Sequence, residues 1–136
     1  TIANVTIDVN SVGVQNIMGY NNHSYITLNS GANIVGSTNG GGAIFGYGQI
    51  TINEGASVVS ESNLALGLDG GSNVYLKGGT VEGGTYAINF RKATCHFHYY
   101  SGSVSGAEGV WKLQNNSAKV HTPSKAIIST VRLRMT

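Results

Sequence analysis

The chain has almost no cysteine, which could cross-link it, and almost no proline, which could interrupt its strands or helices. It has 136 residues with a single proline and a single cysteine, Cys95, so it has no internal disulfide framework. Charged residues make up only 10% and apolar residues 40%, which is typical of neither a disordered nor a membrane protein. No run of about 18 apolar residues occurs, so we expect no transmembrane segment. The length is sufficient for one hydrophobic core, and we expect a single domain over residues 1–136.

Basic residues are absent from the first half. Residues 1–76 carry four acids and no Lys or Arg, a formal charge of −4, whereas residues 77–136 carry eight basic residues and two acids, a formal charge of +6. This dipolar arrangement favours head-to-tail self-association or docking of the basic end on an acidic partner. The basic residues are dispersed and no recognised motif accompanies them, so we expect no nucleic-acid partner. The chain opens "TIANVTIDVN" without Met or a signal-like segment, and we expect a mature product or an excised piece.

The chain is rich in glycine, at 20 positions, and contains a repeated sequence motif. "ITLNSGANIVG" at residues 26–36 returns as "ITINEGASVVS" at residues 50–60, and similar units begin near residues 74, 97 and 120, with a weaker one near residue 5. Within each unit apolar and polar residues alternate, which predicts strands. The repeat units lie near 5–25, 26–49, 50–73, 74–96 and 97–119, followed by a cap near 120–136.

A period of 23 to 24 residues with short strands and Gly/Asn-rich corners is typical of one turn of a β-solenoid. Each turn satisfies its backbone hydrogen bonds by stacking on the next turn about 4.8 Å away. We therefore predict an all-β fold, a parallel β-helix of about five or six turns with a C-terminal cap strand in "STVRLRMT". The alternative is a meandering antiparallel sandwich, which does not require positions to recur at this period. The stretch "GVWKLQNNSAKV" is ambiguous between strand and helix.

Stacking of the units predicts columns of equivalent side chains. Three columns should point inward: Ile26, Ile50, Val74, Phe97 and Val120; Leu28, Ile52, Leu76, Tyr99 and Thr122; and Ile34, Val58, Val81, Val104 and Ile127. One column should point outward: Thr27, Thr51, Tyr75, His98 and His121. The corners should need positive φ, which glycine adopts without cost, at Gly31, Gly55, Gly79 and Gly102.

The segments "GGGAIFGYGQITINEGASVVS" and "GSNVYLKGGTVEGG" resemble repeats of the pectate-lyase-like right-handed parallel β-helix superfamily. They are most similar in pattern to the Gly-rich repeats of bacterial surface proteins and adhesins, and the resemblance covers roughly residues 26–105. It implies right-handed winding and an extracellular, cell-surface or virion location. The superfamily also includes polysaccharide lyases, glycoside hydrolases and phage tailspikes, so the fold alone selects no chemistry.

Acidic residues are too few and too scattered for a catalytic signature. Catalysis on such a scaffold needs carboxylates, or carboxylates with Arg or Lys, clustered on neighbouring turns. The positions equivalent to Glu54 hold Ser or Gly, and no acid shares the position of the Arg91–Lys92 pair. We predict no catalytic residues and no cofactor, and favour a protein that is not an enzyme.

Histidines gather in the last units. His96 and His98 are two residues apart on one strand face, and His121 should stack beside His98. Neutral imidazoles so placed could bind zinc, nickel or copper. No carboxylate or thiolate is placed to complete such a set, because Cys95 should face away from His96. We therefore predict an exposed polar ladder and no metal site.

Aromatic groups flanked by Asn and Thr suit sugar rings, which offer C–H faces and hydroxyls. The candidate ligand-binding residues are Tyr75, His96, His98, Tyr100 and His121. The favoured function is a non-catalytic extracellular structural or adhesive module that binds carbohydrate or a host surface. The first alternative is a fragment of a trimeric phage tail fibre or tailspike, and the second is a polysaccharide lyase or hydrolase.

Overall fold

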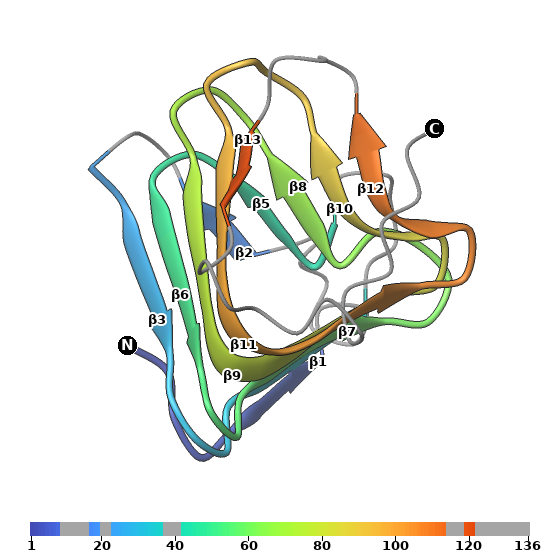
Figure 1. The fold of residues 1–136 in the computed structure, drawn as a ribbon. Helices are drawn as coiled ribbons and strands as arrows, with labels where there is room; N and C mark the ends of the chain where they lie inside the picture. The colour runs from blue at the N-terminus through green and yellow to red at the C-terminus, as the bar shows by residue number, and fades with distance from the viewer. Residues whose placement is uncertain (9–16, 20–22, 37–41, 114–118, 122–136) are drawn as a thin grey trace.

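In the computed structural model the chain winds as a β-solenoid of parallel strands (Figure 1). The structure describes residues 1–8, 17–19, 23–36, 42–113 and 119–121, and none of these residues is helical. The strands are β1 (Thr6–Asp8), β2 (Ile17–Gly19), β3 (Tyr25–Leu28), β4 (Asn33–Val35), β5 (Ile44–Gly46), β6 (Gln49–Asn53), β7 (Ser57–Ser60), β8 (Leu66–Leu68), β9 (Asn73–Gly83), β10 (Tyr86–Phe90), β11 (His96–Gly106), β12 (Gly109–Leu113) and β13 (Lys119–His121).

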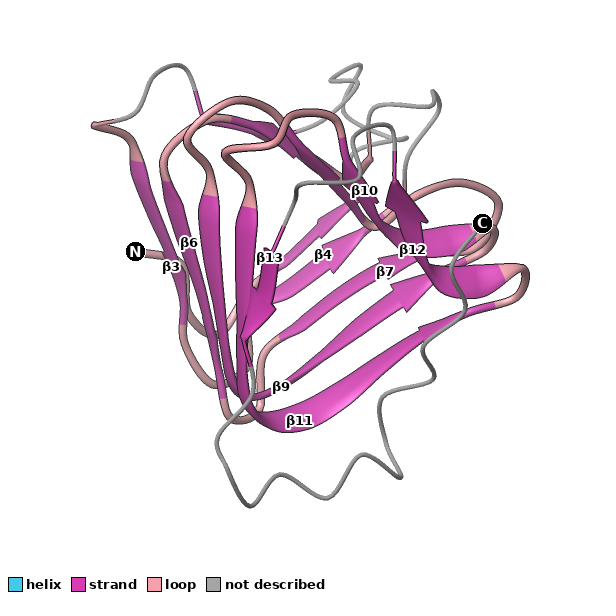
Figure 2. Ribbon diagram, turned by 45° about the horizontal axis from the view of Figure 1, so that its top comes forward, coloured by secondary structure: helices cyan, strands magenta, loops and turns pink. Residues whose placement is uncertain are grey.

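Each complete turn has three sides. The long strands β9 and β11, 11 residues each, bend through a corner (Figure 2). Their first halves continue the side formed by β3 and β6, and their second halves continue the side formed by β1, β4 and β7. A separate sheet in the order β12-β10-β8-β5-β2 forms the third side. All strand pairs are parallel, which rules out the antiparallel sandwich.

The prediction of an all-β parallel solenoid is confirmed, but its turn count is too high. The described residues form about 4 turns rather than five or six. At the two ends, the described residues of the first unit contribute the short strands β1 and β2, and those of the last contribute β13. The cap strand predicted in "STVRLRMT" lies outside the described residues.

Strand register confirms the predicted columns. The first runs from Ile26 through the predicted positions to Val120, the second from Leu28 to Tyr99, and the third from Ile34 to Val104. Most of these side chains are fully buried. Val120 is wrong as an interior residue, because it is 39% exposed on β13, the last described strand of its sheet. Thr122 and Ile127 lie outside the described residues.

A further inward column, on the third side, was not predicted. It stacks Ile44, Leu66, Ile88 and Trp111, all buried. The Trp111 indole packs against the aromatic rings of Phe90 and Phe97, with centroid distances of 5.6 and 5.1 Å. The start of the ambiguous "GVWKLQNNSAKV" stretch is therefore the strand β12, whose tryptophan fills the core near the end of the solenoid.

The corner between the first two sides needs glycine for two different reasons. Positive φ occurs where predicted in three units, at Gly31, Gly55 and Gly102. In the remaining unit the prediction of Gly79 is wrong, because Gly78 takes the positive φ of 99°. Gly79 is required by close packing instead, since a Cβ there would lie 2.5 Å from Cγ2 of Ile52.

Candidate functional site

The candidate site lies on the outer face of the side formed by β3, β6, β9, β11 and β13. Register places the side chains of Thr27, Thr51, Tyr75, His98 and His121 in one outward column, as predicted. Parallel in-register pairing makes this column unavoidable, because equivalent residues on neighbouring strands lie about 4.8 Å apart. The column changes from threonine to aromatic rings at β9.

The rings of this column stack face to face. Tyr75 and His98 have a centroid distance of 4.5 Å at 6°, and His98 and His121 have 4.5 Å at 10°. The ring faces therefore cover one another, and mainly ring edges remain for other molecules.

His96 joins this column from the side. Its backbone is level with Asn73 and Lys119 rather than with His121. Its ring nevertheless lies 5.1 Å from that of His121, with a distance of 2.8 Å from Nδ1 of His96 to Nε2 of His121. One nitrogen from each of His96, His98 and His121 lies within 4.8 Å of the others.

Asn73 orients the His98 ring. The Asn73 amide nitrogen donates to the Gly71 carbonyl at 3.3 Å, which turns the amide oxygen toward Nε2 of His98 at 3.2 Å. An amide oxygen only accepts, so Nε2 carries the proton and Nδ1 keeps a lone pair. Burial lowers the pKa of His98 below 6.5, and the charges of His121 and His96 lower it further. The ring is therefore neutral at pH 7.

Tyr100 is an exposed candidate. It is 51% exposed, and Nζ of Lys77 lies 5.5 Å from its ring centroid and 5.8 Å from that of Tyr75. Tyr99 points inward as predicted, with its hydroxyl donating to the Gly102 carbonyl at 3.0 Å. The sequence did not single out Lys77, although its place two residues after Tyr75 on the same strand face was available as a signal.

Cys95 is separate from this face. It is fully buried, and its Sγ lies 3.4 Å from the Leu68 carbonyl oxygen and 3.2 Å from that of Asp69. Burial raises the pKa of its thiol above 9.0. This confirms that Cys95 faces away from His96.

The expectation that no acid shares the position of the Arg91–Lys92 pair is wrong. Nη1 of Arg91 lies 3.3 Å from Oδ2 of Asp69 on the preceding turn. The Asp69 carboxylate also accepts from the Gly70 amide at 2.8 Å, and the Arg91 guanidinium lies 5.2 Å from the Phe45 ring centroid. These contacts tie the corner after β8 to the turn after β10.

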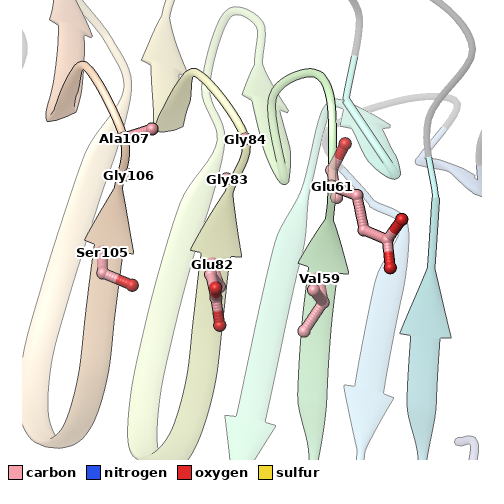
Figure 3. A pocket seen from close by; sticks show the side chains of 9 residues that line it. Val59, Glu61, Glu82, Gly83, Gly84, Ser105, Gly106 and Ala107 are labelled. Atoms are coloured by element: carbon pink, nitrogen blue, oxygen red, sulfur yellow. The ribbon is translucent and has the colours of Figure 1, made fainter.

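A depression of about 400 Å³ lies at the corner where β7, β9 and β11 end (Figure 3). Its carboxylates are those of Glu61 and Glu82, and both residues are exposed. A glycosidase general acid is normally held in a desolvated pocket, an environment that these two residues do not have. The depression therefore carries no catalytic assignment.

No protein-family model, curated protein or solved structure matches this chain. The solenoid assignment consequently rests on strand register, whereas right-handed winding and the resemblance to pectate-lyase-like proteins and adhesins stay predictions. Among the described residues no helix is both long and apolar enough to span a bilayer.

Proposed function

We propose that the chain is a non-catalytic structural and adhesive module, displayed extracellularly on a cell surface or virion, that binds carbohydrate or a glycan-bearing host surface. The observation that carries the proposal is the outer face of β9 and β11. There the threonine column gives way to Tyr75 and His98, with Lys77 and the open ring of Tyr100 beside them.

The contacts of this face suit a sugar in a specific way. Tyr100 would be the stacking platform, because the residue is 51% exposed, whereas the ring of Tyr75 stacks on His98 and that of His98 stacks on both Tyr75 and His121. Tyr75 and Lys77 would supply hydrogen bonds to hydroxyls at the platform's edge. The ammonium of Lys77 would favour an acidic sugar.

A glycan array followed by a titration with the best ligand tests the proposal. Tyr100→Ala should weaken binding by about two- to tenfold, since an aromatic contact contributes roughly 0.5–1.5 kcal/mol. Tyr25→Ala is the matched control, because Tyr25 is 70% exposed on β3, at the far side of the same sheet. Absence of any glycan ligand, or equal losses in both variants, would count against the proposal.

Self-association is favoured by the charge distribution. A solenoid converts position in the chain into position along its axis, so the exposed acids Glu54 and Glu61 lie on earlier turns than the exposed bases Lys77, Lys92 and Lys112. Sedimentation at low and high salt distinguishes head-to-tail stacking from a phage-fibre trimer. Assembly that weakens with salt supports head-to-tail stacking, and a salt-resistant trimer supports the phage-fibre alternative. A monomer at every salt concentration argues against both.

A further inference from the structure

Three histidines from two neighbouring strands converge at one point on the solenoid surface. His98 and His121 are register partners on β11 and β13, and His96 precedes His98 by two residues on the same strand face. One nitrogen of each ring lies within 4.8 Å of the others, and the closest pair, from His96 to His121, is 2.8 Å apart.

These distances bracket those of a metal-bound set. Zn–N bonds are about 2.0–2.1 Å long, which places two nitrogens of a tetrahedral zinc ion about 3.3 Å apart. The closest pair must open by about half an ångström and the most distant must close by at most about 1.5 Å, movements that ring torsions supply. All three rings are partly or fully exposed, so the core does not oppose the adjustment.

The hydrogen bonds of the three histidines are also compatible with metal binding. Asn73 accepts the Nε2 proton of His98, which leaves a lone pair on Nδ1, and hydrogen bonds to one ring nitrogen commonly orient histidine ligands. Between His96 and His121 one ring donates a proton to the other, and a tautomeric shift of that proton frees both lone pairs.

Stacking alone does not account for the cluster. It explains the column of Tyr75, His98 and His121, because equivalent positions of a parallel solenoid must stack. It does not require His96, whose backbone is level with Lys119, to turn its Nδ1 toward His121. The off-column ring creates a three-nitrogen site where a plain ladder has none.

We propose that His96, His98 and His121 together bind one divalent transition-metal ion, with zinc as the first candidate. Three imidazoles occupy three tetrahedral positions, and the fourth faces solvent and takes water or an external ligand. Imidazole donors also suit nickel and copper, and copper should bind more tightly than nickel or zinc. The prediction of no metal site rested on the lack of a carboxylate or thiolate, a ligand that three imidazoles with an open fourth position do not need.

Calorimetric titration of the metal-free chain with zinc chloride near pH 7.5 tests the site. Wild type should bind one equivalent. His98→Phe and His121→Phe keep an aromatic ring in the stack but remove its nitrogens, so they separate metal binding from stacking. Each should weaken zinc binding by at least about 100-fold, since even loss of an outer hydrogen-bonding partner costs roughly 10–100-fold.

His23→Phe is the matched control and should bind zinc as wild type does. His23 precedes β3, which lies three strand steps from β11, or roughly 14 Å. X-ray absorption of zinc-loaded wild type supplies a readout that no variant's folding can disturb, and should show three imidazole ligands. Fewer than three imidazoles, no binding by wild type, or cluster variants that bind as tightly as wild type would each overturn the proposal.

Discussion

Replacing Ile52 by alanine should lower the free energy of unfolding by about 3–4 kcal/mol. Ile52 is fully buried on β6, between its register partners Leu28 and Leu76. The substitution removes three carbons at about 0.8 kcal/mol each and leaves a cavity that costs more, which places the change inside the 2–5 kcal/mol range of such substitutions. The stacked turns above and below limit relaxation into the cavity, because both are held in register by backbone hydrogen bonds.

The loss should be large enough to measure without abolishing the fold. At roughly 0.05–0.15 kcal/mol per residue, 136 residues have a total stability of about 7–20 kcal/mol. Urea unfolding followed by far-UV circular dichroism, with linear extrapolation, should show a lower midpoint at an unchanged slope.

Thr51→Ala is the matched control, because Thr51 is adjacent on the same strand but points outward. Its effect should stay within about 1 kcal/mol. A one-residue shift of β6 would exchange the two faces and therefore the two results. A larger loss for Thr51→Ala than for Ile52→Ala would thus refute the register of the whole sheet.

Further outcomes follow from the surroundings of single residues. Gly102→Ala should destabilise the chain by about 1–3 kcal/mol in the same urea assay, because φ is 112° there and a Cβ would meet the Gly79 carbonyl. Gly70→Ala should be tolerated, since the nearest atom to its Cβ would lie 3.6 Å away. Cys95 should react with a thiol reagent at pH 8 only after guanidinium unfolding, since it is buried and the pKa of its thiol is raised; rapid labelling of the native chain would contradict this. The pKa of His98 is lowered in the folded chain, so the unfolded chain binds a proton at this imidazole more readily. The free energy of unfolding should therefore fall as the pH drops through and below 6.5. Unfolding curves measured between pH 5 and 8 should show that His98→Phe loses part of this pH dependence.

The first two sides of the solenoid were predictable because the corner between them has nearly constant length. Apolar positions there recur every 23 to 24 residues, so one match locates the next. The third side was not predictable in this way. The register partners on that side are spaced 27, 22, 22 and 23 residues apart, from Ile17 through Ile44, Leu66 and Ile88 to Trp111, since the other two corners vary in length. A fixed period therefore fails to align that column, although its residues are as apolar as the others.

The candidate site likewise has a part that the repeat predicts and a part that it does not. Register alone determines that Tyr75, His98 and His121 share an outward column, and the repeat predicted this. The approach of His96 to His121 depends on side-chain torsions, which no repeat encodes. The pairing of Asp69 with Arg91 likewise occurs at a corner, between residues 22 positions apart, outside the strand columns that the period relates.

The histidine cluster joins two strands whose described pairing is short. Within the part of the chain that the structure describes, β13 has three residues and pairs with β11 at those three positions. An ion held by His98 and His121 would link these strands through their side chains, and binding to the folded state alone adds about 2.7 kcal/mol when free zinc is 100 times its dissociation constant. That gain approaches the contribution expected for Ile52, so zinc should raise the unfolding midpoint of wild type and of the His23→Phe control. It should also slow amide exchange at residues 119–121. A zinc-dependent rise that persists in His121→Phe would place the stabilising ion elsewhere, because that variant retains the ring stack but lacks the nitrogen that spans the two strands.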